Sequence, residues 1–253
     1  MLLLHGDCKE QLKKIKDNTV DMTITSPPYD NLRKYDGYSF DFESIAKELY
    51  RVTKSGGVAI WVVGDSTNKG SESGTSFKQA LYFKEIGFNL HDTMIYRKLN
   101  YVPLNHNRYE QEFEYMFCFS KGKPKTFNPI KIPCKYAGQT SWGKPAYYKK
   151  ADGELVAIEK CVINDTKNHG NIFEYRTGST TSTKNYKHPA MFPEQLVIDQ
   201  IKTWSNEGDV ILDPMMGSGT SGEVATKLKR DFIGIEISWQ YFNMAKERIE
   251  SLQ

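Results

Sequence analysis

The sequence predicts an α/β fold, in which a mostly parallel β-sheet is covered by helices on both faces. Short apolar runs that suit buried strands alternate along the chain with segments whose apolar residues recur at helical spacing. The run at 58–63 is continuously apolar, which is typical of a strand with both faces buried. A length of 253 residues with 39% hydrophobic residues suits one large domain, or one domain with an insertion.

The first 120 residues alternate strands and helices. A helical period is clear at 42–52, where five apolar residues fall on one face, and the Ser-Gly-Gly stretch at 55–57 is expected to end that helix. The expected helices are 8–15, 42–52 and 77–88, and the expected strands are 2–4, 20–25, 58–63, 90–96 and 115–119, of which the last two form a pair.

This pattern is interrupted between residues 121 and 187. The segment has no clear period and holds thirteen Lys and Arg against five Asp and Glu, a net charge of +8 in a chain whose formal net charge is +3. The aromatic residues interleaved with its lysines are Tyr136, Trp142, Tyr147, Tyr148, Phe173, Tyr175 and Tyr186. Regular order then resumes, with helices expected at 193–204, 219–229 and 239–252 and strands at 210–212 and 232–237.

The cysteines and the apolar runs indicate a compartment. Four scattered cysteines without a Cys-x-x-Cys pair favour a reducing cytosol over a zinc site or a disulfide framework. The opening stretch MLLLHGDCKE turns polar too early for a signal peptide, and no run of about 18 apolar residues predicts a membrane span. We therefore expect a cytoplasmic protein with no bound metal and no membrane partner.

A glycine turn follows the strand expected at 210–212. Gly217 and Gly219 lie in the stretch DPMMGSGT, and glycines let a backbone turn sharply and approach a ligand closely. Glu236 ends the next strand about 20 residues later, where a dinucleotide-type fold places a carboxylate on ribose hydroxyls. Trp239 suits either an adenine ring or the core, and Asp7, at another strand end, could hold a ligand amino group. A plain strand-to-helix connection is the alternative interpretation.

A second motif, Ser26-Pro27-Pro28-Tyr29, follows directly after the strand expected at 20–25. The two prolines donate no backbone hydrogen bond and end the strand. Pro-Pro is common in turns, so a plain turn is the alternative here. The position right after a buried strand, at the edge where open α/β sheets bind ligands, favours a functional role.

Together, Ser26-Pro27-Pro28-Tyr29 and the stretch 213–220 resemble the S-adenosylmethionine-dependent DNA amino-methyltransferases. The order, with the SPPY motif first and the glycine turn last, is similar to that family's β group. The stretches KSGG at 54–57 and KHPAMFPEQLVIDQI at 187–201 are similar as well, and the resemblance covers nearly the whole chain outside 121–187. It implies a Rossmann-like methyltransferase fold in a circularly permuted order, with S-adenosylmethionine as the cofactor.

The resemblance also implies a layout and a set of site residues. Residues 1–120 would form the catalytic half, 121–187 an inserted basic region for DNA target recognition, and 188–253 a cofactor-binding half in the same domain as 1–120. The methionine part of the cofactor would meet Asp213, Pro214, Gly217, Gly219 and Thr220, the ribose Glu236, and the adenine end Asp7 and Trp239, while His188, Pro189 and Phe192 would close over it.

The implied reaction is methyl transfer to an exocyclic amino group of a base extruded from double-stranded DNA. Such an amino group is a poor nucleophile because its lone pair is delocalised into the ring. The Ser26 hydroxyl and the Pro27 carbonyl can accept its hydrogens, Pro28 stiffens the loop, and Tyr29 offers a face for stacking. The basic segment would bind phosphates. Weaker candidates for DNA contact are Asn31, Arg33 and Tyr35.

Several alternatives stay open at this point. Serine at the first motif position favours cytosine N4 in the resembled family, and adenine N6 is the alternative. An RNA or protein-glutamine methyltransferase and a non-catalytic DNA-binding protein are less favoured. Cys134 follows a proline, as in ring-carbon cytosine methyltransferases, but it lies in the basic segment and is interpreted as incidental. The sequence leaves open whether the chain forms a homodimer, as members of the resembled family often do, and whether a cognate restriction endonuclease accompanies it in a bacterial or phage host.

Overall fold

The structure is a computed structural model that describes residues 1–28, 40–101, 103, 107–140, 146–158, 162–176 and 192–252. Contacts divide the chain into two compact units. Unit 1 comprises Met1–Asn128 and Asn171–Gln253, and unit 2 comprises Pro129–Gly170. None of the helices in the described ranges has the length and apolar character that crossing a bilayer requires.

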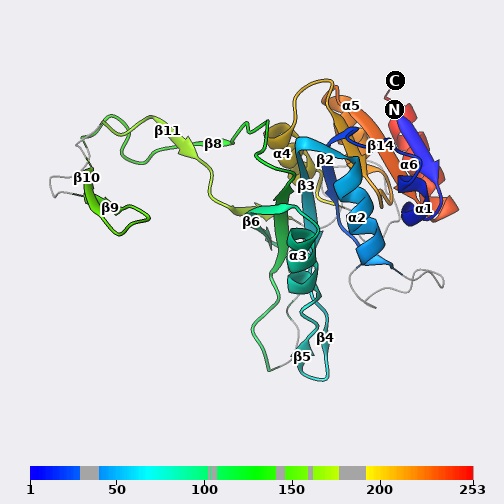
Figure 1. The fold of residues 1–253 in the computed structure, drawn as a ribbon, viewed down its shortest axis with the longest axis horizontal. Helices are drawn as coiled ribbons and strands as arrows, with labels where there is room; N and C mark the ends of the chain where they lie inside the picture. The colour runs from blue at the N-terminus through cyan, green and yellow to red at the C-terminus, as the bar shows by residue number, and fades with distance from the viewer. Residues whose placement is uncertain are drawn as a thin grey trace. The chain divides into compact units, whose positions relative to one another are not determined.

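Unit 1 is built on an eight-stranded sheet (Figure 1). In order across the sheet, the strands are β1 (Leu2–His5), β14 (Asp231–Glu236), β13 (Val210–Asp213), β2 (Val20–Thr25), β3 (Thr53–Val63), β7 (Phe113–Ser120), β6 (Asn89–Lys98) and β12 (Ile172–Tyr175). Strand β7 runs antiparallel to both of its neighbours, and the other neighbouring pairs in this sheet are parallel. The predicted, mostly parallel sheet and the predicted pairing of its 90–96 and 115–119 strands are therefore confirmed.

In the described ranges, three helices cover each face of this sheet. Helices α1 (Cys8–Leu12), α2 (Phe42–Val52) and α3 (Thr75–Glu85) pack on one face, and α4 (Glu194–Trp204), α5 (Thr220–Lys227) and α6 (Trp239–Glu250) pack on the other. Strand β3 shows why both faces are apolar. Its alternate residues Val58, Ile60 and Val62 enter the α4–α6 core, while Ala59, Trp61 and Val63 enter the α1–α3 core.

The start of β3 differs from the prediction. The Ser-Gly-Gly stretch does not end the helix, because α2 ends at Val52 and the strand begins at once with Thr53. Gly56 has a φ of +79°, and a Cβ on Gly57 would lie 2.9 Å from the carbonyl oxygen of Asp21. The two glycines thus form an irregular strand start pressed against β2. Helix α1 also ends three residues earlier than expected, and β12 forms within the segment for which no regular structure was expected.

The strand order creates a switch point between β13 and β2. Strand β13 connects through α5 to β14 on one side, and β2 connects through α2 to β3 on the other. The strands at this point are parallel, so their carboxyl ends meet at one edge, where open α/β sheets bind their ligands. In chain order the β2 half comes first and the β13 half last, as the permuted order predicts.

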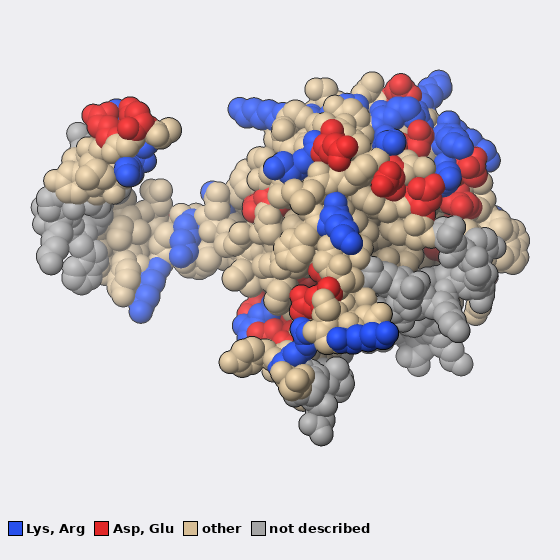
Figure 2. All heavy atoms as spheres, turned by 60° about the horizontal axis from the view of Figure 1, so that its bottom comes forward, with Lys and Arg blue, Asp and Glu red and all other residues tan. Residues whose placement is uncertain are grey.

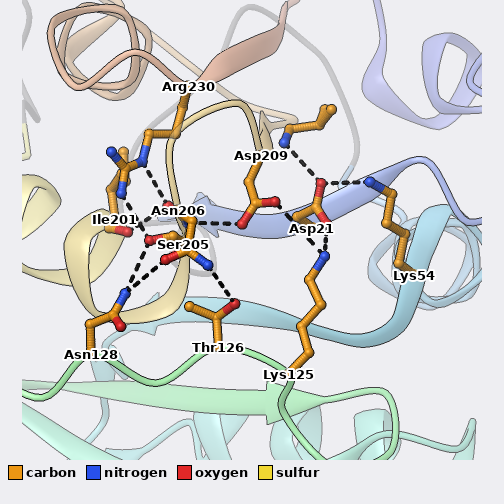
Figure 3. Close-up of polar contacts among 11 residues, drawn as sticks. Asp21, Lys54, Lys125, Thr126, Asn128, Ile201, Ser205, Asn206, Asp209 and Arg230 are labelled. Carbon is orange, nitrogen blue, oxygen red and sulfur yellow. Dashed lines mark hydrogen bonds and ion pairs between the residues drawn. The ribbon is translucent and has the colours of Figure 1, made fainter.

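A polar network closes the opposite, amino-terminal edge of these strands (Figure 3). Asp21, 2% exposed at the start of β2, accepts hydrogen bonds from Lys54 Nζ at 2.7 Å and from Val210 N at 2.9 Å, and it pairs with Lys125. Burial raises the pKa of Asp21, but these donors more than offset it and leave the pKa below its usual value. Asn128 Nδ2 donates to the carbonyl of Ser205 at 3.4 Å, so the chain is fixed to unit 1 where unit 2 begins.

Unit 2 consists of two antiparallel ribbons. Strands β8 (Lys131–Pro133) and β11 (Thr166–Asn168) form one, and β9 (Ala146–Lys149) and β10 (Leu155–Ile158) form the other. None of its residues with a described side chain is buried, and Tyr147 and Tyr148 are 56% and 52% exposed. The described part of this unit therefore has little apolar burial of its own, and two-stranded ribbons of this kind are marginal in water.

Candidate active site

Five parallel strands end in polar groups at the carboxyl edge of the sheet. Across the sheet these groups are Asp7 after β1, Glu236 at the end of β14, Asp213 at the end of β13, Ser26 after β2 and Asp65 after β3. The structure therefore brings the serine-proline motif and the glycine turn to adjacent strands, although they lie almost 190 residues apart in the chain.

Asp213 joins these two motifs directly. Its Oδ1 accepts a hydrogen bond from Thr25 Oγ1 at 2.8 Å and another from Met215 N at 3.1 Å, and its Oδ2 accepts one from Ser221 Oγ at 2.5 Å. Burial raises the pKa of Asp213 to about 6, and these donors offset part of the rise. The 2% exposed carboxylate is thus a buried junction between β2, the turn after β13 and helix α5.

Glu236 connects the glycine turn to the following loop. Its Oε2 accepts a hydrogen bond from Gly217 N at 2.9 Å, and its Oε1 accepts one from Ser238 N at 2.8 Å. Burial raises the pKa of Glu236, while these backbone donors oppose the rise. A carboxylate has about four lone-pair positions, so each oxygen retains acceptor capacity for a ligand hydroxyl.

The glycine turn has two left-handed residues, with φ of +52° at Gly217 and +80° at Gly219. Gly219 also lies against α6, because a Cβ built on it would stand 2.8 Å from Ala245 Cβ. Close packing of α5 on α6 therefore requires this glycine, independently of any ligand. Pro214 is buried at the start of the turn.

Thr220, the first residue of α5, is held from the side of α6. Its Oγ1 accepts a hydrogen bond from Arg248 Nη1 at 3.0 Å, and the same nitrogen donates to the carbonyl of Ser218 at 3.3 Å. Arg248 is 5% exposed and pairs with Glu223. A buried guanidinium with a carboxylate partner thus fixes both the last residues of the turn and the start of the helix.

The far end of the edge offers an exposed ring and a half-buried carboxylate. Trp239 is 61% exposed, stacks on Phe242 with ring centroids 5.7 Å apart, and meets the His5 ring edge-on at 4.7 Å. The alternative that Trp239 belongs to the core is therefore wrong. Asp7 caps α1 by accepting from Lys9 N at 2.9 Å.

The serine-proline motif is described only in part. Ser26 and Pro28 are half-buried and Pro27 is buried at the end of β2. Tyr29, His188 and Pro189 lie outside the described residues, as do Asn31, Arg33 and Tyr35. Phe192 is half-buried against the α4–α6 core.

Four residues at this site were missed by the sequence analysis. Thr25, Ser221 and Arg248 act through side-chain contacts between distant segments, for which the sequence gives no signal. Gly222 was readable, because it completes the pattern Gly-x-Gly-x-x-Gly over 217–222. A Cβ on Gly222 would lie 2.3 Å from Ile249 Cδ1, so this third glycine serves close helix packing.

The groups at this edge fit an adenosine ligand that carries a charged amino acid. An exposed ring offers stacking, half-buried and buried carboxylates accept from hydroxyl and amino groups, and the left-handed turn leads into the amino end of α5. The donor set therefore suits S-adenosylmethionine, which combines a ribose, an adenine and a cationic methionine part.

Comparisons with known proteins agree with this geometry. The profile of a DNA methylase family, N6_N4_Mtase, matches residues 20–247. The orphan methyltransferase M.BamHII of Bacillus amyloliquefaciens is 52% identical over 250 residues, which are 94% of this chain and 92% of that protein. The type II methyltransferase M.BglII of Bacillus subtilis is 27% identical over 96% of this chain and 67% of its own length.

Solved structures share the fold. M1.HpyAVI in complex with SAM has a TM-score of 0.61 at 26% identity, with 98% of each chain covered. The cytosine-N4-specific PvuII DNA methyltransferase has a TM-score of 0.72 at 18% identity, with 99% of this chain and 89% of that chain covered. The chain therefore belongs to the DNA methylases, as an S-adenosylmethionine-dependent DNA methyltransferase that modifies an exocyclic amino group, cytosine N4 or adenine N6.

Proposed function

We propose that this enzyme methylates cytosine N4 in a specific DNA sequence, with adenine N6 as the second candidate. The observation that carries the proposed site is the buried hydrogen bond of 2.8 Å between Thr25 and Asp213, which joins the strand before Ser26 to the glycine turn. Serine rather than aspartate at the start of the motif supports cytosine over adenine within the resembled family.

The proposed catalytic residues act on the amino group rather than on the donor. When bound, S-adenosylmethionine would supply the methyl group of its sulfonium: the amino nitrogen would bond to the methyl carbon, S-adenosylhomocysteine would leave with the carbon–sulfur electron pair, and the amino proton would pass to solvent. The Ser26 hydroxyl and the Pro27 carbonyl accept hydrogen bonds from the amino hydrogens and so raise the electron density on nitrogen. Pro27 is buried, which fixes its carbonyl, and Tyr29 provides the stacking face for the extruded base.

The cofactor-binding roles follow the carboxyl edge. We assign the ribose to Glu236, the adenine to Asp7 and Trp239, and the methionine part to the turn from Pro214 to Thr220. His188 and Phe192 are proposed to close over the cofactor. Asp213 is proposed to act by holding the turn, because its three described hydrogen bonds are all internal to the protein.

The region 121–187 is proposed to recognise the DNA target. Unit 2 lies within it and presents ribbons with exposed Tyr147 and Tyr148, and a two-stranded ribbon fits the major groove of B-DNA. On the face that Figure 2 shows, Lys and Arg lie among acidic side chains, so phosphate contacts on this face would come from individual side chains.

We further propose a cellular location and two protein partners for the enzyme. Cys8 and Cys118 are buried and unpaired, which supports a cytoplasmic location. The type II name of the Bacillus subtilis relative supports a search for a cognate restriction endonuclease beside this gene. A homodimer remains a proposal that sedimentation of the purified protein tests.

The product of the reaction tests this function. The purified protein is incubated with methyl-labelled cofactor and bacterial DNA, the DNA is digested to nucleosides, and the labelled nucleoside is identified. N4-methylcytosine is expected. N6-methyladenine would shift the assignment to the second candidate, and label in RNA or protein alone would overturn it. Ser26→Ala should abolish labelling, while Ser71→Ala, at an exposed serine in β5 (Ser71–Glu72), should not.

A further inference from the structure

Two buried threonines on β2 offer a direct comparison. Thr23 and Thr25 are two residues apart and so point to the same side of the strand, and both are 0% exposed. The Thr25 hydroxyl donates to Asp213 Oδ1 at 2.8 Å, whereas the Thr23 hydroxyl finds no hydrogen-bond partner among the described residues. Strand β2 thus carries two buried threonines, of which Thr25 makes a described side-chain hydrogen bond and Thr23 does not.

We propose that Thr25 is a positioning residue that sets the distance between the methyl acceptor and the methyl donor. Thr25 directly precedes Ser26, which is proposed to hold the amino group, and its partner Asp213 directly precedes the turn that is proposed to hold the cofactor. The inference rests on the proposed function of these two motifs. It adds that the hydrogen bond between Thr25 and Asp213 fixes the position of the serine-proline motif relative to the glycine turn.

The other contacts of Asp213 indicate that loss of this bond should change the relative position of the two motifs rather than the affinity for the cofactor. Without the Thr25 hydroxyl, the carboxylate still accepts from Met215 N and Ser221 Oγ, so the turn keeps two of its three bonds. What is lost is the one described side-chain hydrogen bond from this carboxylate to β2. Displacements of about 1 Å between reacting groups can lower a rate by about a hundredfold, so the loss should appear in kcat.

A purely structural role is the competing explanation. Removing a buried hydroxyl can lower stability without any special relation to catalysis. Thr23→Val is the matched control, because it makes the same chemical change at the same depth on the same strand but breaks no described hydrogen bond. Thr25→Ser retains the hydroxyl and should rescue the function.

The experiment compares wild type, Thr25→Val, Thr25→Ser and Thr23→Val on DNA with saturating cofactor. It measures kcat, the Kd for S-adenosylhomocysteine by calorimetry, and unfolding in urea. Thr25→Val should lower kcat by about tenfold to a hundredfold and change the Kd by no more than about threefold. Thr25→Ser and Thr23→Val should keep kcat within about threefold of wild type.

Two results would overturn the proposal. One is a kcat for Thr25→Val that equals that of Thr23→Val, and the other is a weaker Kd with an unchanged kcat. If the valine variant does not fold, Thr25→Cys, which keeps the volume and weakens the donor, takes its place with the same expected result. A wild type that transfers no methyl group to DNA would refute the proposed function and this role with it, whereas an active wild type with an equally active Thr25→Val refutes this role alone.

Discussion

Gly219→Ala should destabilise the enzyme for two separable reasons. The first is the backbone, because φ at Gly219 is +80°, and an alanine in this left-handed region costs about 1–2 kcal/mol. The second is packing, because the new Cβ would lie 2.8 Å from the Cβ and 2.9 Å from the Cα of Ala245 in α6. Forcing α5 and α6 apart costs about 1–3 kcal/mol, so the total loss should be about 2–5 kcal/mol.

A second glycine separates the two contributions. Gly208 has nearly the same φ, +81°, and a Cβ there would meet nothing within 4 Å. Gly208→Ala should therefore cost only the backbone part, about 1–2 kcal/mol, in urea unfolding monitored by circular dichroism. The difference between the two variants measures the contact with Ala245.

Ala245→Gly completes the test. In the Gly219→Ala background it removes the contacting Cβ, so it should recover part of the lost stability even though glycine inside a helix costs about 1 kcal/mol on its own. Equal losses for Gly219→Ala and Gly208→Ala, with no recovery from Ala245→Gly, would refute the packing argument.

Three further predictions concern the pH dependence of stability at Asp213, the cofactor affinity at Arg248 and the activity of a Cys134 variant. Asp213→Asn should remove a pH dependence of the stability. The folded-state pKa of Asp213, about 6, lies above the usual 3.8, so folding favours the protonated carboxyl group. In urea unfolding, wild type should therefore lose about 3 kcal/mol of stability relative to the variant as the pH rises from about 4 to 6. Arg248→Met should weaken binding of S-adenosylhomocysteine about tenfold in calorimetry, because the carbonyl of Ser218 and the hydroxyl of Thr220 lose their charged donor. Arg248→Lys should recover part of the lost affinity, and an unchanged Kd for Arg248→Met would contradict this prediction. Cys134→Ser should keep methylation within about twofold of wild type, because Cys134 follows no strand of the eight-stranded sheet and belongs to neither proposed motif. Complete loss would instead indicate a cysteine nucleophile.

The order of elements could be predicted because it depends on local pattern. Continuous apolar runs predicted the central strands, and the position of the serine-proline motif directly after a buried strand predicted that Ser26 lies at the carboxyl edge of the sheet. Strand β12 escaped prediction because it is only four residues long and is defined by its pairing with β6. Pairing with a distant strand leaves little trace in a short segment.

The side-chain contacts of the site could not be predicted from the sequence, because they too join segments that are distant in the chain. Thr25 is one of two similar threonines in a buried strand, and only the neighbouring strand determines which hydroxyl finds a carboxylate. The sequence also carries no sign that Gly219 packs against Ala245, a contact set by the crossing of α5 and α6; its approach to a ligand stays a prediction. Both cases depend on distances between segments that are far apart in the chain.

The buried carboxylates at this edge make physical sense as a site for a cation. Burial raises the pKa of both Asp213 and Glu236, so holding them ionised near neutral pH costs stability that an apolar residue would not cost. Hydroxyl and backbone donors offset only part of that cost. A positively charged ligand beside them would lower both pKa values and return part of the lost free energy on binding. If the cofactor binds at this edge as proposed, its positive charge would act on Asp213 through the field alone, while Asp213 keeps its bonds to the turn.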